Sequence, residues 1–243
     1  MAKNPPGRRR LPYGLVILHE DQDVIVVDKP PGLLTVGAGA EPANQTRTVH
    51  FVLTDYVRKH CARSRKRVFV VHRLDRETSG VLIFAKSEEA KLRLQERWKE
   101  TKKTYLAAVH GRCDKMSETI SSYLAENKAY FVYATPDPAR GKLAETAYRV
   151  LKQTRRFALL EVDLVTGRKN QIRVHLAGIG HPVVGDRKYG RHDDGFAHLA
   201  LHARSISFPH PYRGEVLHFT AQVPAYFQKL VGPIDDAEDP AAS

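Results

Sequence analysis

Short β-branched and aromatic runs, separated by polar turns, recur along the chain. Residues 14–30 hold two such runs around a polar turn at residues 19–23, which predicts a β-hairpin ending at the Pro30-Pro31-Gly32 break. Alternation is clearest over residues 157–164. Further strands are predicted over residues 80–85, 104–109, 144–151, 199–208 and 215–221, the last two separated by a turn at residues 209–214.

Helical segments are fewer. Residues 48–59 read as a helix, and Ser87 followed by two acids predicts a second helix that runs to about Trp98. Asn170 is the predicted N-cap of a short helix through Leu176, closed by glycines 178 and 180, with Arg173 in its first turn. Many strands with few helices favour an α+β fold with a mixed, largely antiparallel sheet and flanking helices, rather than regular βαβ units.

The length of 243 residues fits one large domain or two small ones. We expect a basic extension over residues 1–13, a folded domain over residues 14–230 and an acidic, disordered tail over residues 231–243. No apolar run approaches the roughly 18 residues that span a bilayer, and the first residues lack the apolar core of a signal peptide. These features predict a cytoplasmic protein, which we expect to be monomeric.

The charge of the chain lies in its body. The formal net charge is +12, from 39 Lys and Arg against 27 Asp and Glu. The first ten residues hold four cations and the tail holds four acids, so removing both ends leaves the excess unchanged. A basic body points to a polyanionic partner, above all nucleic acid, although it also fits a merely solubilising surface.

Residues 57–67 concentrate this charge. They contain six Lys or Arg and no acid, which fits either a solvated loop or an RNA contact. Arg65, Lys66 and Arg67 are the candidates for RNA binding. The two cysteines, Cys61 and Cys113, are far apart and form no CxxC pair, so neither a disulfide framework nor a zinc site is predicted.

Three separate segments place polar residues at the end of a predicted apolar strand or helix. They read VHRLDRETSG, KKTYLAAVHG and TGRKNQIRVHLAGIGHPVVGDRKYG. If Asp75 is sheltered in a cleft, its ionised form needs a compensating cation, and Arg173 is a candidate partner. Such a carboxylate can attack a sugar carbon or remove a proton, and Tyr105 can serve as an acid or base. A turn cap, a core tyrosine and a structural ion pair remain the alternatives for these residues.

Taken together, the segments resemble those of the RluA-type pseudouridine synthases. HRLDRETSG is similar to the family's active-site motif, and KTYLAAVHG to its tyrosine-bearing segment. HEDQDVIVVDKPPGLL, GRKNQIRVHLAGIGHPVVGDRKYG and LHARSISFPHP resemble the remaining motifs in the same order, so that the resemblance covers roughly residues 14–226. One departure is Asn170, where the family commonly has His. Because the first motif begins near residue 19, we expect the chain to lack the small N-terminal RNA-binding domain that many members of this family carry.

The resemblance implies the pseudouridine synthase catalytic fold over residues 14–230 and isomerisation of selected uridines in structured rRNA or tRNA, without metal or organic cofactor. It makes Asp75 the catalytic carboxylate, either adding to C1′ or abstracting the 2′ hydrogen. Tyr105 would stack on the flipped base and assist proton removal at C5, and Arg173 would pair with Asp75. Arg73 would fill the vacated position in the RNA stack, and Leu176 would form part of the base pocket. The other predicted RNA-binding residues are His72, Arg76, Arg168, Lys169 and Asn170.

Two other functions remain open at this level. A glycoside hydrolase would need a second carboxylate within roughly 10 Å of Asp75. Glu77 is the nearest in sequence, although we expect it to be a surface residue. An RNA-folding or assembly factor would bind RNA without catalysis. No histidine spacing among His72, His175 and His181 predicts a metal site.

Overall fold

A computed structural model describes residues 9–37, 45–59, 61, 63–190 and 195–234. Most of the predicted basic extension and most of the acidic tail lie outside these residues. The chain divides into unit one, residues 1–102 with 203–222, and unit two, residues 103–202 with 223–243. The single domain over residues 14–230 stays a prediction.

Unit one is built on a β-sheet in which most neighbouring strands are antiparallel. The predicted hairpin is confirmed as β2 (Val16–Glu20) and β3 (Val24–Lys29), with a turn shorter than predicted because His19 and Glu20 continue the strand. The apolar run after the HRLDRETSG motif is β5 (Ser79–Ala85), in which every residue is buried. The strand order is β1 (Arg9–Arg10), β2, β3, β5 and β11 (Leu201–Pro209), with β4 (Phe69–Val70) paired to β5 and β12 (Val216–Thr220) paired to β11.

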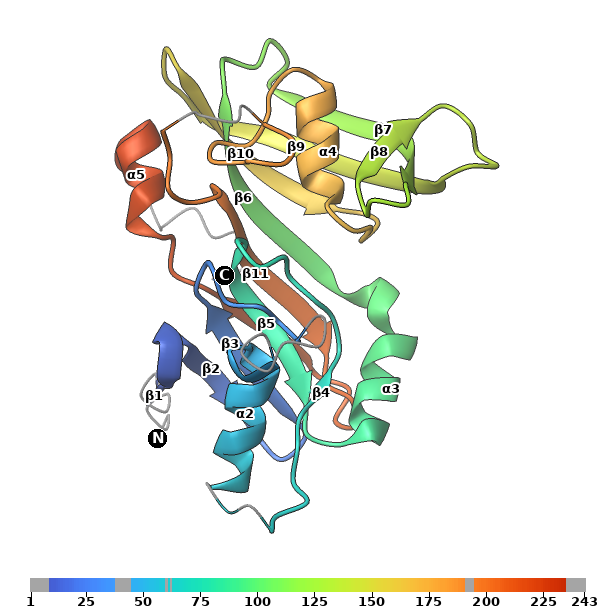
Figure 1. Cartoon of the computed structure of the whole chain (residues 1–243), viewed down its shortest axis with the longest axis vertical. Helices are drawn as coiled ribbons and strands as arrows, with labels where there is room; N and C mark the ends of the chain where they lie inside the picture. The colour runs from blue at the N-terminus through green and yellow to red at the C-terminus, as the bar shows by residue number, and fades with distance from the viewer. Residues whose placement is uncertain (1–8, 38–44, 60, 62, 191–194, 235–243) are drawn as a thin grey trace. The chain divides into compact units, whose positions relative to one another are not determined.

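Both helices predicted for unit one are confirmed. Helix α2 (Val49–Arg58) starts where the hydroxyl of Thr48 accepts a hydrogen bond from the amide of Phe51, and it ends at Lys59 in the left-handed conformation. Helix α3 (Glu88–Glu96) is capped in the same way by Ser87, and Figure 1 shows it beside β5. Ala90 and Leu94 of α3 pack with buried residues of β3, β5 and β11 in one apolar core. Two 3-10 turns, η1 (Pro12–Gly14) and η2 (Trp98–Glu100), complete the unit.

The glycine that ends the HRLDRETSG motif is required by close packing. Gly80 has a φ of 108°, and a Cβ atom added to it would lie 2.1 Å from the carbonyl oxygen of Ala203 in β11. No side chain fits between two backbones at that distance. Gly80 therefore lets β5 run directly against β11 at the point where the polar loop ends.

The strands of unit two pair antiparallel in the order β6 (Lys102–His110), β10 (Phe157–Leu164), β9 (Lys142–Gln153), β7 (Ser117–Glu126) and β8 (Val132–Thr135). The strands predicted over residues 104–109, 144–151 and 157–164 are confirmed as β6, β9 and β10. The β7–β8 pair was not predicted, because β7 exposes alternate polar residues and β8 has only four residues.

Two helices pack on unit two. Helix α4 (Gln171–Gly178) lies against β8 and β9 (Figure 1), with Val174 in a core that includes Leu124, Val132 and Ala144. Helix α5 (Ala225–Val231), which was not predicted, packs on β10. The α+β class is confirmed, and none of the described helices is long and apolar enough to span a bilayer.

One detail of α4 corrects the sequence interpretation. Asn170 occupies the N-cap position, but it lies in the left-handed region at φ 55° and its side chain caps no helix amide. Its amide group instead donates to the hydroxyl of Tyr189 at 3.0 Å, and its oxygen accepts from Arg173 at 3.2 Å. Asn tolerates this backbone conformation better than most residues, so Asn170 serves the neighbouring side chains rather than the helix end.

Candidate active site

The loop that carries Asp75 connects β4 to β5 and is fixed by a buried threonine. The hydroxyl of Thr35 accepts a hydrogen bond from the amide of Leu74 at 3.2 Å and donates one to the Leu74 carbonyl at 2.9 Å. Thr35 is only 2% exposed, so water competes little for these bonds. On the far side of Asp75, its carbonyl accepts from the amide of Thr78 at 3.2 Å. The backbone is thus held immediately before and after the carboxylate.

A buried lysine holds the same loop through its backbone carbonyls. Lys29 is 0% exposed, and its ammonium group donates to the carbonyls of Arg76, Leu33 and Pro30 at 2.9, 2.8 and 3.0 Å. Burial lowers the pKa of Lys29 to about 7, against the opposing effect of the charges of Glu77, Asp75 and Asp28. Three acceptors match the three protons of an ammonium group, so the charged form satisfies every group in this cluster.

The remaining residues of the loop divide into anchors and exposed cations. The ring of His72 packs against Trp98 at 4.9 Å, and its Nε2 accepts from the amide of Ile83 at 3.2 Å. Arg73 and Arg76 are exposed and Asp75 is half-buried, which leaves the cations and the carboxylate accessible to a polyanion. Glu77 is a surface residue as predicted, since half of its side chain is exposed beside Arg76.

The cations of the basic segment also lie at the surface of unit one. Arg65, Lys66 and Arg67 are exposed, and the guanidinium of Arg67 lies 4.8 Å from the centre of the Phe69 ring. Arg58 at the end of α2 donates to the Lys66 carbonyl at 2.9 Å. The backbone of this segment is therefore tied to α2 while its charged groups face solvent.

In unit two, Tyr105 sits in the middle of β6, opposite Val162 of β10, and is 8% exposed. The segment that follows α4 runs along the same strand. Val183 forms an antiparallel bridge with Val109, and the amide of Val184 donates to the Ala108 carbonyl at 2.9 Å. This pairing carries Asp186 alongside the strand that holds Tyr105.

Arg173 forms a bidentate ion pair with Asp186, a partner that the sequence interpretation missed. Its Nε and one terminal nitrogen each donate to a carboxylate oxygen at 2.7 Å, and the side chain of Asp186 is fully buried. Burial favours a higher pKa for Asp186, but hydrogen bonds from Arg173 and from the amides of Tyr189 and Lys188 hold that pKa below its ordinary value. The guanidinium also lies 5.1 Å from the centre of the Tyr189 ring, so its plane is fixed on several sides.

The other predicted residues of unit two surround this ion pair. Leu176 is fully buried on α4, whereas Arg168 and Lys169 are exposed just before the helix. Arg168 donates to the Leu143 carbonyl at 3.2 Å, and Lys169 forms an ion pair with Glu126 of β7. The loop before α4 is therefore tied to both β9 and β7.

Helix α4 is docked onto the sheet by polar side chains. His175 is 2% exposed and bridges the hydroxyl groups of Ser122 and Thr146 at 3.0 and 2.9 Å. Gln171 donates to the same Thr146 hydroxyl and to the Glu145 carbonyl, both at 2.9 Å. These bonds fix the rotation of α4 and with it the direction of Arg173.

This docking predicts an acid-sensitive stability. Burial lowers the pKa of His175 to about 4 from its ordinary value of 6.5. Between these pH values the unfolded chain binds a proton that the folded chain does not, so the stabilisation is complete above about pH 6.5 and is lost as the pH falls towards 4. The loss amounts to about 3 kcal/mol.

Urea unfolding at pH 7, 6 and 5 measures this effect. His175→Gln retains a hydrogen-bonding side chain but does not titrate, and the other titrating groups are common to both proteins. The difference in unfolding free energy between wild type and variant is therefore expected to shrink as the pH falls. A constant difference over this range would contradict the assignment to His175.

One group in unit one has the donor atoms of a metal site. Among the described residues, Asp21, Asp23 and His210 bring three ligand atoms within 4.8 Å of one another. The carboxylate of Asp21 already accepts from His19 and His210 at 3.3 and 3.1 Å and forms an ion pair with Arg213. A guanidinium beside the carboxylate opposes a second cation, so this group is a hydrogen-bonded hub that ties the β2–β3 turn to the turn between β11 and β12.

The predicted site residues thus form two groups, one in each unit, and each group is held in place by its neighbours. The described part of unit one holds His72, Arg73, Asp75 and Arg76 on one clamped loop, and unit two holds Tyr105, Arg173 and Leu176 on β6 and α4. The pairing of Asp75 with Arg173 stays a prediction. Lys29, Thr35 and Asp186 were not identified from the sequence as residues that support the site. Lys29 and Asp186 lie inside two of the quoted motifs, and that position is the signal by which they could have been found.

Comparison with known proteins places this chain in a family. Residues 23–178 match the family model described as RNA pseudouridylate synthase. The chain is 37% identical to an uncharacterised RNA pseudouridine synthase homologue of Mycoplasma pneumoniae over 222 residues, covering 88% of this chain and 69% of that protein. It is 33% identical to the ribosomal large subunit pseudouridine synthase C of Buchnera aphidicola, covering 90% and 70%.

A solved structure agrees with this placement. Human RNA pseudouridylate synthase domain containing 4 superimposes with a TM-score of 0.71 at 25% identity, covering 87% of this chain and 89% of that one. The fold, the order of the motifs and these similarities point to one chemistry. The chain belongs to the RNA pseudouridylate synthase family and is an RNA pseudouridine synthase, an isomerase that converts uridine in RNA into pseudouridine.

Proposed function

We propose that this enzyme isomerises uridines in structured ribosomal RNA, with Asp75 as the catalytic carboxylate. The observation that carries the role of Asp75 is the doubly clamped loop, in which Thr35 and Lys29 fix the backbone on either side of a half-buried carboxylate. A group held in this way needs little reorganisation when charge develops on the ribose.

The reaction breaks the bond between N1 and C1′ and forms one between C5 and C1′. The C5 proton leaves and N1 gains a proton, so no oxidant, reductant or second substrate is consumed. Asp75 acts at the ribose, either by adding to C1′ or by removing the 2′ hydrogen. Tyr105 stacks on the detached base and assists the removal of the C5 proton. Arg173 pairs with Asp75 and offsets its negative charge.

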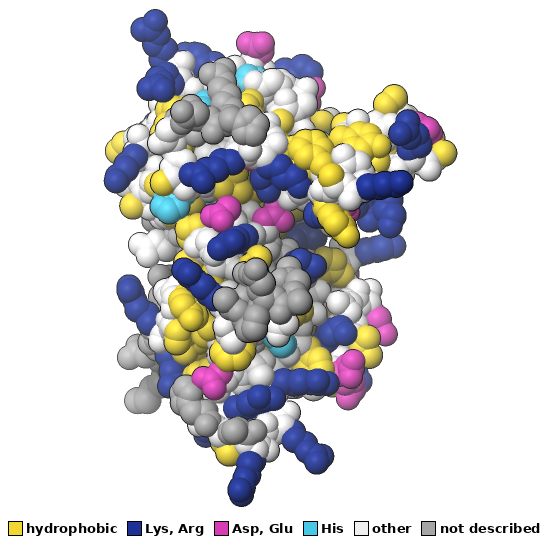
Figure 2. Space-filling model, viewed as in Figure 1, with side chains coloured by type: hydrophobic (Ala, Val, Ile, Leu, Met, Phe, Trp, Pro, Cys, Tyr) yellow, Lys and Arg dark blue, Asp and Glu magenta, His cyan; other side chains and the backbone are white. Residues whose placement is uncertain are grey.

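Access to a uridine inside folded RNA requires base flipping, which costs a few kcal/mol of stacking. Arg73, exposed on the Asp75 loop, fills the vacated position, and Leu176 supplies part of the apolar wall around the base. The cations at residues 65–67 and 168–169 bind phosphates elsewhere in the same RNA. Figure 2 shows Lys and Arg side chains over the visible face of each unit, with few acids among them, which agrees with a polyanionic substrate.

The choice of ribosomal RNA is supported by the relative from Buchnera aphidicola, whose name specifies the large ribosomal subunit. Ribosomal RNA and tRNA from cells that lack this enzyme should be incubated separately with the purified protein, and pseudouridine should be mapped at single-nucleotide resolution. New sites confined to ribosomal RNA are the expected result. New sites confined to tRNA would overturn the substrate class while leaving the chemistry intact.

A further inference from the structure

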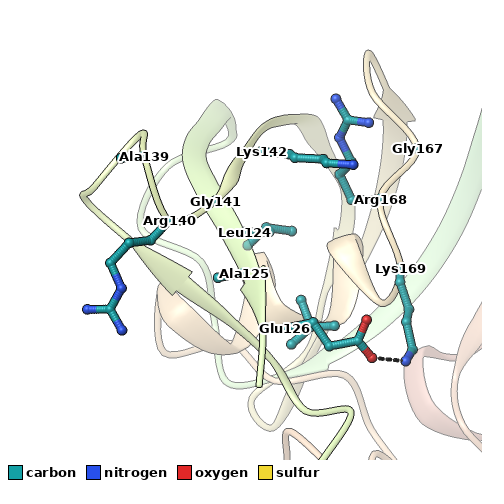
Figure 3. A pocket seen from close by; sticks show the side chains of 11 residues that line it. Leu124, Ala125, Glu126, Ala139, Arg140, Gly141, Lys142, Gly167, Arg168 and Lys169 are labelled. Atoms are coloured by element: carbon teal, nitrogen blue, oxygen red, sulfur yellow. Dashed lines mark hydrogen bonds and ion pairs between the residues drawn. The ribbon is translucent and has the colours of Figure 1, made fainter. Parts of the chain in front are cut away.

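A hollow in unit two lies outside the residues assigned to catalysis. It has a volume of about 570 Å³ and opens between the β7–β8 hairpin, the loop before β9 and the loop before α4. Leu124 and Val132 form part of an apolar floor and are buried. Figure 3 shows Lys142, Arg168 and Lys169 around this floor, while the side chain of Arg140, which also lines the hollow, points outward from its rim.

The cations outnumber the acids around the hollow. Glu126 is the one acid in its lining, and it is taken up by an ion pair with Lys169. Within the described residues, the side chains of Arg140 and Lys142 form no ion pair or hydrogen bond, and both are exposed. Their charges are therefore available to an anionic ligand, and binding of RNA phosphates to them is favoured by the release of condensed counterions.

The wall that carries these two cations has a fixed shape. The carboxylate of Asp137 accepts from the amide of Ala139 at 2.8 Å, and its carbonyl accepts from the amide of Arg140 at 3.2 Å. A Cβ atom added to Gly141 would lie 2.9 Å from the Cβ of Tyr123, so the loop rests directly on β7. Glycine at this position brings both cations to the rim of the hollow.

An exposed aromatic ring stands at the Lys169 edge. Tyr130, at the tip of the β7–β8 hairpin, is 72% exposed, and the ammonium of Lys169 lies 5.3 Å from its ring centre. The tip is held by the side chain of Asn127, which accepts from the amides of Ala129 and Phe131, and by Lys188, which donates to the Tyr130 carbonyl at 3.0 Å. Figure 2 shows hydrophobic side chains beside Lys and Arg side chains over this end of unit two.

We propose that the cationic hollow and the Tyr130 ring together bind a single-stranded segment of the RNA substrate away from the target uridine. Phosphates of the segment lie against Arg140, Lys142 and Arg168, and one unstacked base lies on Tyr130. Exposed aromatic rings beside a cationic groove are the features by which proteins hold unpaired RNA, since every base has a face that can stack. This inference rests on the proposed function, because it extends the footprint of the same substrate.

The test uses a fluorescently labelled oligouridylate of about 12 nucleotides, whose binding to the full chain is followed by anisotropy from about 50 to about 200 mM KCl. Arg140→Gln/Lys142→Gln removes two charges from the hollow. Arg112→Gln/Arg155→Gln is the matched control, because it removes the same charge at two exposed positions. These positions lie in turns near the Gln153 end of β9, whereas Lys142 is at its other end. Tyr130→Ala tests the stacking contact alone.

The Arg140→Gln/Lys142→Gln variant is expected to bind about tenfold more weakly at 100 mM salt. The slope of log affinity against log salt concentration is expected to decrease in magnitude by about 1.4, which corresponds to the loss of two phosphate contacts on a single strand. The control pair is expected to change affinity less than about twofold, and Tyr130→Ala to weaken binding at least about fivefold without changing the slope. Equal losses in the hollow and control pairs, or no binding by the wild type, would overturn the inference.

Pseudouridine formation by the wild type on ribosomal RNA is measured in parallel. If the wild type forms pseudouridine but the hollow variants bind oligouridylate as the wild type does, the second binding site is wrong and the proposed function stands. If the wild type forms no pseudouridine in any RNA, the proposed function is wrong, and the binding data still decide whether the hollow holds RNA.

Discussion

Replacing Asp75 with Asn is expected to slow pseudouridine formation by about a thousandfold or more under single-turnover conditions, while RNA affinity changes only a few-fold. The substitution preserves the size of the side chain and removes its charge. Because the backbone on both sides is held by Thr35 and Lys29 rather than by the carboxylate, the fold of the loop is expected to survive. A gel-based binding assay and a rate measurement on the same RNA separate the two quantities.

Glu77→Gln is the matched control for that experiment. It makes the same kind of change two residues away on the same loop, at a side chain that is half exposed. Its rate is expected to stay within about twofold of wild type, as is usual for surface positions. A large loss in Glu77→Gln together with a small loss in Asp75→Asn would reverse the assignment of the catalytic carboxylate.

Replacing Asp186 with Asn is expected to lower the unfolding free energy by about 3 kcal/mol and the single-turnover rate at saturating RNA by about a hundredfold. The variant keeps the shape of the side chain but leaves the guanidinium of Arg173, which is 13% exposed, without its buried counter-charge. The slower rate is expected because Asp186 positions the guanidinium of Arg173, for which a role in catalysis is proposed. RNA affinity is therefore expected to change far less than the rate.

Urea unfolding and single-turnover kinetics on the same preparations test this expectation. Asp163→Asn serves as the control, since Asp163 is exposed on β10 of the same unit and accepts one hydrogen bond from Thr104. It is expected to shift stability by no more than about 0.5 kcal/mol. A loss of stability in Asp186→Asn without a slower rate would mean that Asp186 is structural only.

The sequence predicted the strands and helices that have a clear apolar pattern or a clear cap residue. The β2–β3 hairpin, β5, β6, β9 and β10 contain runs of β-branched, aromatic and other apolar residues, and α2 and α3 start at hydroxyl caps that work as expected. The β7–β8 hairpin was not predicted because one of its faces is polar and solvent-exposed, so its sequence resembles that of a polar loop. Helix α5 escaped because it is short and its stability depends on packing against β10.

The residues proposed for catalysis were easier to select from the sequence than the residues that support them. Asp75, Tyr105 and Arg173 stand in recognisable motifs, whereas the partners of a buried group depend on tertiary contacts. Asp186 lies 13 residues beyond Arg173, and only the bridge between Val183 and Val109 shows why the two meet. Lys29 reads as a solvated cation before a proline and is instead fully buried among three carbonyls.

The most direct test of the central claim follows the hydrogen on C5. RNA carrying tritium at C5 of its uridines should be incubated with wild type and with Asp75→Asn, and tritium in water and free uracil should both be measured. Isomerisation by Asp75 predicts one tritium released for each pseudouridine formed by the wild type, no free uracil, and almost no release by the variant. Free uracil without tritium release would indicate a hydrolase, and binding without either product would indicate an RNA assembly factor. Both results would contradict the isomerase reaction proposed for this site.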